Sequence, residues 1–308
     1  MPVIVPNGLP AIDTLANENI TVISESRAKS QDIRPLKIII LNLMPTKIAT
    51  ENQLIRVLSN TPLQVELTFL QTETHQSKNT PPEHLETFYQ AFNDIRHACF
   101  DGLIVTGAPV ETLAFEEVDY WEELCDILTW SKTHVFSTIH ICWGAQAGLY
   151  FHHGIPKYQM DRKLSGIYRH QVEHPCHPLM RGFDETFLAP HSRHTEIRVS
   201  DLEQKSELEV LSMSPDAGVY LVATKDFRQI YLTGHPEYDA ETLNLEYLRD
   251  VARGLNPEPP VHYFSTLPGQ SPQNRWRGHA YLLFGNWLND VYQKVPYDIE
   301  QIKNISHR

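Results

Sequence analysis

Strand-like and helix-like patterns alternate along the first half of the chain. Runs of β-branched and other apolar residues predict buried strands at 36–43, 64–70, 100–107 and 135–141. Helical periodicity predicts helices between them at 47–58, about 82–97 and about 116–132. This alternation predicts an α/β fold with a doubly wound, mostly parallel sheet, whose ligands bind at the carboxyl ends of the strands.

The second half of the chain has a different pattern. Residues 157–194 are polar and contain several prolines and histidines, so we expect irregular structure there. Three short strands at 209–214, 218–224 and 229–233 predict a meander that returns to the sheet, and helices are expected at 238–254 and 276–294. We therefore predict an N-terminal extension (1–35) that packs on the core, a catalytic domain (36–254) and a C-terminal helical extension (255–308) within the same globule.

One hydrophobic strand ends abruptly at Cys142 and is followed by a helix of small residues. That helix begins Trp-Gly-Ala-Gln-Ala-Gly, so it can leave the strand at a sharp angle and pack closely on the sheet. At such a corner the helix dipole and the free N–H groups favour a thiolate. The pattern is typical of a nucleophile elbow with sulfur in place of oxygen. We therefore expect Cys142 to be a nucleophile rather than a small residue that fills a turn.

A candidate base follows another short strand. His235 and Glu237 are two positions apart, so in an extended strand end both side chains would leave the same face. Glu237 would then hold the imidazole in the tautomer that presents its other nitrogen to the thiol. The order Cys142, His235, Glu237 predicts a nucleophile, a general base and an orienting carboxylate.

Composition narrows the classes of partner. The chain has 26 basic and 38 acidic residues and a formal net charge of −12, so we expect no nucleic-acid partner. No apolar run approaches the roughly 20 residues that span a bilayer, and the first residues lack a signal-peptide pattern, so no membrane partner is expected. Four dispersed cysteines form no disulfide framework, which favours a cytoplasmic location.

Two further motifs carry smaller hypotheses. The HPCHP stretch (174–178) has metal-ligating residue types, but its prolines and short spacing offer one turn rather than two ligand pairs, so no metal site is predicted. The MPTK stretch (44–47) follows a strand as a phosphate loop does, but it lacks the glycines that wrap phosphates. Its main-chain N–H groups and Lys47 remain a candidate contact for an anionic part of a substrate.

The cysteine elbow and the His-Pro-Glu strand end resemble the class I glutamine amidotransferase-like fold. Further stretches are similar to the homoserine O-acyltransferases of methionine biosynthesis, a family of O-succinyl- and O-acetyltransferases. They are NLMPTK (42–47), TGAPVE (106–111), FEEVDYW (115–121), ICWGAQAGLY (141–150), APHSRHTE (189–196) and GHPEYD (234–239). The similarity runs in order from about Asn17 to about Val291, nearly the whole chain.

The resemblance implies a double displacement. Cys142 attacks the acyl-CoA thioester, and homoserine, deprotonated by His235, then attacks the acyl-enzyme. It also implies substrate contacts at Lys163 and Ser192, and at Arg249 for the amino-acid carboxylate, a role that suits a guanidinium fork. No cofactor is expected, because acetyl-CoA is a substrate.

The loop at 106–109 follows a buried strand and offers main-chain N–H groups near the expected elbow. In the amidotransferase-like fold the corresponding loop forms part of the oxyanion hole, together with the N–H after the nucleophile. The resemblance therefore implies donors at Ala108 and Trp143, and loss of one such donor typically costs on the order of 10²–10³ in rate. The structural alternative is a glycine and a proline that merely end a strand.

The acyl group is expected to depend on Glu111. The resemblance implies that succinyl-transferring members have glycine at this position and acetyl-transferring members have glutamate. Glutamate adds bulk and a charge that would repel the distal carboxylate of succinate, by about 1–4 kcal/mol at roughly 4 Å. We therefore expect a homoserine O-acetyltransferase that uses acetyl-CoA and L-homoserine. The alternative is a solvated glutamate that starts the next helix.

Other functions stay open on the sequence alone. They are a homoserine O-succinyltransferase that uses succinyl-CoA, a glutamine-hydrolysing or peptidase-like hydrolase with the same Cys-His-Glu arrangement, and a non-catalytic binding protein that has kept the fold. The resemblance also implies a homodimer, with the amphipathic C-terminal helix as a candidate contributor.

Overall fold

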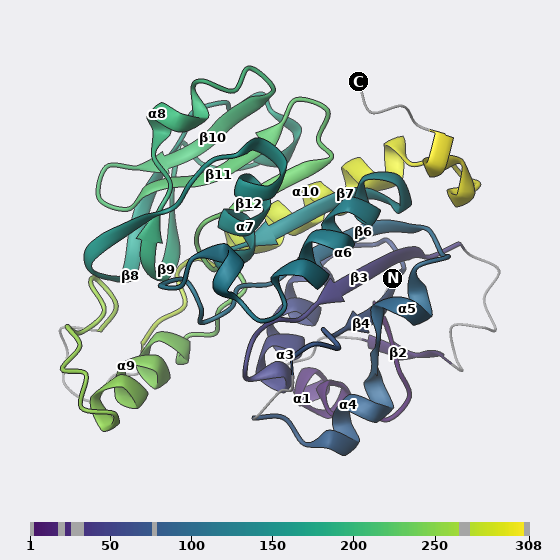
Figure 1. The fold of residues 1–308 in the computed structure, drawn as a ribbon, viewed down its shortest axis with the longest axis horizontal. Coiled ribbons are helices and arrows are strands. Elements are labelled where there is room, and N and C mark those ends of the chain that lie inside the picture. Colours follow the sequence, from purple (N-terminus) through teal and green to yellow (C-terminus); the bar gives the residue numbers. More distant parts are fainter. Residues whose placement is uncertain (1–2, 18–21, 26–33, 76–78, 265–271, 305–308) are drawn as a thin grey trace.

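One sheet crosses the whole molecule. The computed structural model describes residues 3–17, 22–25, 34–75, 79–264 and 272–304. Within them a twelve-stranded sheet runs in the order β2-β1-β4-β3-β6-β7-β12-β11-β10-β8-β9, with β5 beside β4 (Figure 1). The predicted α/β class with a mostly parallel, doubly wound sheet is confirmed for the half from β2 to β12.

The parallel half contains the four strands that the apolar runs predicted. Its strands are β1 (Val3–Val5), β2 (Val22–Ser24), β3 (Leu36–Leu41), β4 (Val65–Leu70), β5 (Tyr89–Gln90), β6 (Phe100–Val105), β7 (Val135–Ile141) and β12 (Gln229–Leu232). All the pairs among them are parallel. Helices cover both faces, so these strands are apolar on both sides, as a parallel sheet requires.

The other half is antiparallel and corrects one expectation. It consists of β8 (Tyr158–Val172), β9 (Thr186–Glu196), β10 (Leu208–Ser214) and β11 (Gly218–Thr224). The segment 157–194, expected to be irregular, is mostly the long β8–β9 pair. Antiparallel strands tolerate a solvated face, and polar side chains can pair between them, so no apolar run marks them. The buried rings of His170 and His191 illustrate this, with their Nε2 atoms 2.9 Å apart.

Helices form a layer on each face of the parallel half. α1 (Ala11–Asn17), α3 (Lys47–Leu58) and α10 (Arg277–Lys294) pack against Ile38 and Ile40, whereas α6 (Trp121–His134) and α7 (Trp143–His153) pack against Ile39 and Leu41. The remaining helical segments are α4 (Pro82–Phe88), α5 (Phe92–Ile95), α8 (Val199–Leu202), α9 (Thr242–Ala252) and three short turns, η1 (Phe115–Glu117), η2 (Pro178–Met180) and η3 (Ile299–Asn304).

Three expected helices have different bounds. The helix expected at about 116–132 is α6, which begins at Trp121 and ends at His134, and residues 115–117 form the separate turn η1. The helix expected at 82–97 is divided into α4 and α5, because Tyr89 leaves the helix to pair with Phe69 of β4 and donates its hydroxyl to the buried Glu51. The helix expected at 238–254 begins only at Thr242, after a turn. The helix at 47–58 has the predicted bounds.

The C-terminal helix is part of the core. The ring of Trp287 packs against Gly102 of β6, where a Cβ atom would lie only 2.7 Å from it, and its indole N–H donates to Ser137 at 3.0 Å. Phe284 and Leu288 are also buried there. In the described part of the chain, no helix combines the length and apolar character needed to cross a membrane.

Candidate active site

The site begins at the sharp corner between β7 and α7. Cys142 has φ of 52°, a left-handed conformation that is strained for a residue with a side chain and is typical of functional corners. Its amide donates to the Leu232 carbonyl at 2.6 Å, which fixes the corner to the end of β12. A Cβ atom at Gly144 would lie 2.6 Å from the Thr106 carbonyl oxygen, so the helix can pack this closely only because glycine is there.

His235 and Glu237 reach the same sheet edge because β12 runs parallel to β7, with Leu232 opposite Ile141. His235 Nδ1 lies 2.7 Å from Glu237 Oε1. The two residues do not continue an extended strand as expected, because the Tyr238 amide returns to the His235 carbonyl in a turn. Within this turn the carboxylate contacts the ring.

The neighbours of His235 raise the pKa of its imidazole. Burial, the largest single influence, lowers its pKa, but the thiol of Cys142 and the carboxylate of Glu237 together raise that pKa well above its usual value by charge and by hydrogen bonds. His235 and Cys142 are therefore suited to form an imidazolium–thiolate pair. Gly107 packs against both, because a Cβ there would lie 3.3 Å from Cys142 Cβ and 3.4 Å from His235 Cε1.

Two main-chain amides near this corner have no acceptor among the residues that the structure describes. Trp143 is the first residue of α7, so its N–H has no partner within the helix. Ala108 follows Gly107 in a loop that is fixed by a hydrogen bond of 2.8 Å from the Leu43 amide to the Thr106 hydroxyl. Neither the Ala108 nor the Trp143 amide donates to any residue that the structure describes. Each amide is one residue after a residue of the Gly107–Cys142 contact.

A polar cluster lies beside the cysteine, on β8, β9 and α9. The carbonyl oxygen of Ser192 is 3.9 Å from Cys142 Sγ, and its hydroxyl donates to Glu246 at 2.5 Å. Lys163 lies on strand β8, not in an irregular segment as expected, and contacts Asp250 at 3.0 Å and Glu246 at 3.8 Å. Ser192 and Lys163, two of the three predicted substrate positions, thus both contact Glu246.

Arg249, the third of these positions, lies on α9 as expected. Its guanidinium contacts Asp250 at 2.8 Å and remains 44% exposed, so it is open to an incoming anion. Burial alone would raise the pKa of Asp250, but Lys163 and Arg249 bring that pKa below its usual value. The carboxylate is thereby kept charged, and it fixes both cations.

Sequence reasoning missed Glu246, the centre of this cluster. One carboxylate oxygen accepts from Ser192, and the other accepts from the Tyr238 hydroxyl at 2.8 Å. The Tyr238 ring in turn stacks on His235, with centroids 4.0 Å apart. Only its spacing on α9 could have indicated it, since residues 246, 249 and 250 share one face of a helix.

Arg193 was also missed. This guanidinium is buried, and it donates to the carbonyl oxygens of Thr195 at 2.7 Å and Ala217 at 2.5 Å. Burial lowers its pKa, and the charge of the Cys142 thiolate is the largest influence that opposes this. A buried cation therefore adds to the positive environment of the sulfur, next to Ser192 in the chain.

Glu111 lies three residues after Ala108, in a loop that Lys157 holds. The Lys157 ammonium donates to the main-chain oxygens of Glu111 and Leu113, both at 2.5 Å, and lies 4.5 Å from the centre of the Phe115 ring. Burial lowers the pKa of Lys157, and Glu111 opposes this. Lys157 gave no sequence signal, because its partners are main-chain atoms about 45 residues earlier.

Lys47 is not directed into solvent. Its ammonium donates to the Asn42 carbonyl, it lies 5.4 Å from the Tyr89 ring centre, and burial lowers its pKa to about 8 against the raising effect of Glu51. Any contact with an anionic substrate would compete with these interactions.

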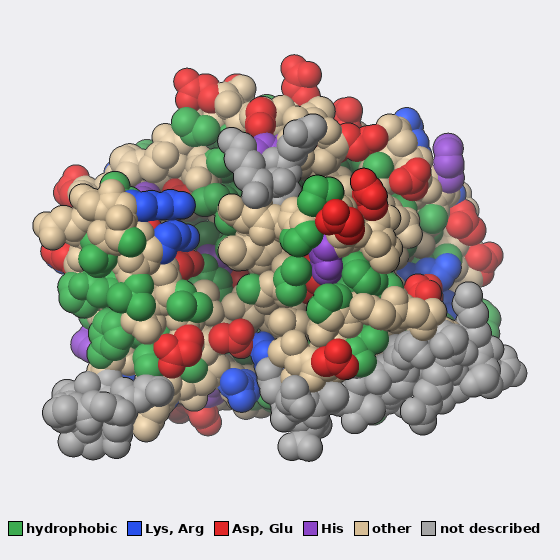
Figure 2. All heavy atoms as spheres, turned by 90° about the horizontal axis from the view of Figure 1, so that it is seen from below, with side chains coloured by type: hydrophobic (Ala, Val, Ile, Leu, Met, Phe, Trp, Pro, Cys, Tyr) green, Lys and Arg blue, Asp and Glu red, His purple; other side chains and the backbone are tan. Residues whose placement is uncertain are grey.

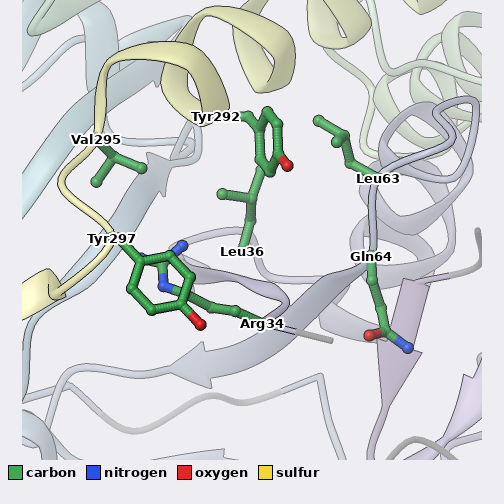
Figure 3. Close-up of a pocket in the computed structure, with 7 residues that line it drawn as sticks. All are labelled: Arg34, Leu36, Leu63, Gln64, Tyr292, Val295 and Tyr297. Atoms are coloured by element: carbon green, nitrogen blue, oxygen red, sulfur yellow. The ribbon is translucent and has the colours of Figure 1, made fainter. Parts of the chain in front are cut away.

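One hollow is remote from the cysteine. It has a volume of about 340 Å³ and lies at the amino ends of β3 and β4, the edge opposite Cys142 (Figure 3). It is lined by Arg34, Leu36, Leu63, Gln64, Tyr292, Val295 and Tyr297. Another hollow, of about 170 Å³, adjoins Pro109 and Val110, at the carboxyl ends of the strands.

The HPCHP stretch forms a turn that packs by its rings. His177 stacks on Phe227 with centroids 4.4 Å apart, and Cys176 is exposed. No group of three or more histidine, cysteine, aspartate or glutamate side chains that could hold a metal ion occurs among the residues that the structure describes.

Comparison with known sequences shows similarity over nearly the whole chain. The model of a family described as homoserine O-succinyltransferase matches residues 2–297. A homoserine O-acetyltransferase of Petrotoga mobilis is 56% identical over 304 residues, 98% of each chain. Homoserine O-acetyltransferases of Bacteroides fragilis and Clostridium beijerinckii are 55% and 57% identical, and each alignment covers 98% of this chain and 100% of the relative.

Comparison with solved structures shows the fold. A glutamine amidotransferase from Thermotoga maritima is similar with a TM-score of 0.58 at 11% identity, covering 85% of this chain and all of that one. A putative GMP synthase subunit from Thermoplasma acidophilum is similar with a TM-score of 0.52 at 14% identity, covering 85% and 96%. At such low identities the likeness concerns the class I amidotransferase-like fold alone, and the expectation of that fold is confirmed.

Proposed function

The chain belongs to the homoserine O-succinyltransferase family, and we propose that it transfers acetyl from acetyl-CoA to L-homoserine through a thioester on Cys142. Its activity as a homoserine O-acyltransferase of methionine biosynthesis follows from relatives that match nearly its full length. The observation that carries the proposed route is the position of the buried His235: its Nδ1 lies 2.7 Å from Glu237 Oε1, and Gly107 packs against both its ring and Cys142.

In the first half-reaction the Cys142 thiolate attacks the thioester carbonyl of acyl-CoA. A carbon–sulfur bond forms, and the negative charge that develops on the carbonyl oxygen is stabilised by the amides of Ala108 and Trp143. The bond to CoA then breaks, and the CoA thiolate takes the proton of the His235 imidazolium. Cys142 is left as an acyl-thioester, and His235 is left neutral.

In the second half-reaction neutral His235 removes the proton from the homoserine hydroxyl. The oxygen attacks the thioester carbonyl, the same amides stabilise the intermediate, and the carbon–sulfur bond of Cys142 breaks. The imidazolium–thiolate pair is thereby restored without a further proton donor. Glu237 supports both steps, because its negative charge stabilises the imidazolium and its contact with Nδ1 leaves Nε2 for the reacting atoms.

The polar cluster around α9 has the charges that homoserine requires. The exposed guanidinium of Arg249 suits the α-carboxylate, and the carboxylate of Glu246, already close to Lys163 and Ser192, suits the α-ammonium. Because Tyr238 links Glu246 to the ring of His235, an amino acid held here would have its hydroxyl directed toward the base. We propose this cluster as the acceptor site.

Glu111 supports acetyl rather than succinyl as the acyl group. It follows the oxyanion loop directly, and Lys157 holds its main chain in place. A glutamate here opposes a second carboxylate by bulk and charge, whereas acetyl has neither the length nor the charge. The relatives named above are homoserine O-acetyltransferases, although the family carries the succinyl name.

The test is intact mass spectrometry of the protein incubated with each acyl-CoA in the absence of homoserine. We expect a mass increase of one acetyl group from acetyl-CoA, located on Cys142, and its loss when homoserine is added. Little or no adduct should form from succinyl-CoA. Equal adducts from both donors would contradict the acetyl assignment, and release of ammonia from glutamine would favour the hydrolase instead.

A homodimer is the proposed assembly, and the exposed face of α9 supports it. Leu245, Leu248 and Val251 are 63%, 52% and 47% exposed and share one side of the helix, and Leu255 is 65% exposed beyond it. Figure 2 shows hydrophobic side chains gathered on the left of the molecule, where α9 lies in Figure 1. A second copy would cover this face. α10, the expected contributor, instead buries its apolar face in the core.

We also propose that the protein is cytoplasmic and that it uses no cofactor. The cysteines at 99, 125, 142 and 176 are all free, and a nucleophilic thiol requires a reducing compartment. Both substrates supply the atoms and charges that the transfer needs, so no further group takes part.

A further inference from the structure

A crevice of about 170 Å³ is lined in part by Pro109 and Val110, at the end of the loop 106–109 that contains Ala108. Its lining residues come from the loops after β3, β4 and β6 and from the start of α6, and are largely apolar: Leu43, Met44, Pro45, Lys47, Gln71, Thr72, His75, Asn79, Pro109, Val110 and Tyr120. Neither Cys142 nor any residue of the acceptor cluster is among them.

The topology of the sheet gives this crevice a particular position. β3 leads through α3 to β4 on one side, whereas β6 leads through α6 to β7 on the other. The neighbouring strands β3 and β6 therefore form the point at which the winding of the sheet reverses. In open α/β sheets ligands bind outside the carboxyl ends of the strands at such a point. The loops after β3 and β6, with Met44 and Val110, are the walls of the crevice.

The crevice lies close to the reacting sulfur. Gly107 packs against Cys142. Pro109, which lines the crevice, is two residues after Gly107, so the Cα atoms of Gly107 and Pro109 are at most about 7.6 Å apart. The acceptor cluster, in contrast, is on β8 and β9, which lie on the other side of β7 in the sheet order, and on α9, which contacts β8 through Lys163.

The chemistry of the walls suits a slender chain with few charges. Leucine, methionine, proline, valine and tyrosine form most of the surface, and the amides of Gln71 and Asn79 add polar groups. The one ammonium group among the lining residues, that of Lys47, donates to Asn42. This surface favours the arm of acyl-CoA, which alternates methylene groups with amides, over the compact, doubly charged homoserine.

We propose that the β3–β6 crevice binds the pantetheine arm of acyl-CoA, and that homoserine enters from the α9 side. This inference rests on the proposed function, since it names where the donor of that reaction binds. It implies that each substrate has its own entrance to one cysteine. Filling the crevice should then impair the first half-reaction and spare the second.

Steady-state kinetics can separate the two half-reactions. In a double displacement, kcat/KM for acetyl-CoA reports acylation, and kcat/KM for homoserine reports transfer from the acyl-enzyme. Met44→Trp and Val110→Trp fill the crevice from opposite walls. We expect each to lower kcat/KM for acetyl-CoA by about tenfold or more and to leave kcat/KM for homoserine within about twofold. Leu63→Trp, in the remote pocket of Figure 3, is the control of equal bulk and should change neither value.

A donor without an arm completes the test. S-methyl thioacetate should acylate Cys142 in the two crevice variants at the wild-type rate, because it has nothing to place in the crevice. An equal loss with both donors, or unchanged kcat/KM for acetyl-CoA in Met44→Trp, would overturn the assignment of the crevice. If wild-type protein forms no adduct on Cys142 with either donor, the proposed function itself fails, which is a separate and recognisable result.

Discussion

The Nδ1 atom of His235 lies 2.7 Å from Oε1 of Glu237, both side chains being almost fully buried. This contact fixes the orientation of the ring, and the charge of Cys142 acts together with Glu237 to raise the pKa of His235. Burial of the pair means that its charges are weakly screened by solvent. The reactivity of the cysteine is therefore expected to depend on a carboxylate that does not itself touch the substrate.

Replacing Cys142 should abolish acyl transfer. We expect Cys142→Ala to form no acyl adduct and Cys142→Ser to lose nearly all turnover, because a serine hydroxyl ionises far less readily than a thiol. Intact mass and CoA release measure this directly. Cys125→Ser, a change to a half-buried cysteine on α6, is the control and should keep wild-type activity. A full adduct on Cys99 or Cys125 in Cys142→Ala would contradict the assignment.

His235 and Glu237 should differ in the size of their effects. His235→Asn removes the base for both half-reactions, so we expect a loss on the order of 10³-fold or more in kcat. Glu237→Gln keeps a contact to Nδ1 but removes the charge, so we expect a smaller loss, on the order of 10²-fold. Steady-state rates with acetyl-CoA and homoserine measure both. Wild-type kinetics in Glu237→Gln would show that the carboxylate is not needed to orient the ring.

Changing Glu111 should change the choice of acyl group. We expect Glu111→Gly to raise the ratio of succinyl-CoA to acetyl-CoA use by about tenfold, which corresponds to removing about 1.4 kcal/mol of repulsion. The two kcat/KM values give this ratio. Glu117→Gly, in the same surface segment, controls for a general loss of charge. An unchanged ratio in Glu111→Gly would mean that Glu111 is only a solvated residue and does not select the acyl group.

Lys157 should influence the choice of acyl group by holding the loop that contains Glu111. Lys157→Met removes both hydrogen bonds to the main chain around Glu111, so we expect the preference for acetyl-CoA to weaken severalfold while Cys142 still labels normally. Lys132→Met is the matched control, because Lys132 also lies over an aromatic ring, that of Phe151, but holds no loop of the site. Equal losses with both donors would indicate only a structural role.

The raised pKa of His235 predicts a pH-dependent contribution to stability. A group whose pKa is raised by folding stabilises the protein fully below its unfolded value, about 6.5 for histidine, and loses this effect as the pH rises through its folded value. The free energy of unfolding of wild-type protein relative to His235→Asn should therefore decrease from pH 6 upward. Urea titrations at several pH values measure it. A difference that grows with pH would reverse the assigned direction.

The contribution of Cys142 to the raised pKa of His235 can be tested separately. In Cys142→Ala the raising effect of the thiolate is absent, so the pH range over which His235 contributes stability should be narrower than in the wild type. An identical pH range in Cys142→Ala and the wild type would mean that Glu237 alone holds the proton.

The sequence identified much of the fold because each strand or helix of the parallel half is marked by the pattern of its own residues. Apolar runs marked β3, β4, β6 and β7, and the bounds of α3 agree with its helical pattern. Buried parallel strands must be apolar on both faces, so the strand signal is present in each segment by itself. The β8–β9 pair was missed because its stability comes from partners across the sheet, and its polar residues hide the alternation.

The residues of the candidate site differ in the same way: some are marked by the sequence around them, and others are not. Cys142, His235 and Glu237 were recognisable because the backbone around each is special: a strained corner, a strand end and a short turn, all marked by glycine or proline nearby. Glu246 and Arg193 carry no such local mark. Their importance arises from what lies opposite them, a serine hydroxyl on another strand and the sulfur of the elbow.

The sequence by itself determined the main strands and helices of the parallel half, the sharp corner at Cys142 and the family, because each depends on residues that are adjacent in the chain. Only the tertiary structure decided what surrounds the cysteine. The crevice between β3 and β6, the bonds of Lys157 to the loop of Glu111 and the cluster on α9 all join segments tens of residues apart. Their energies depend on burial and on distances between non-adjacent groups, and these quantities exist only when the sheet has brought the loops to one edge.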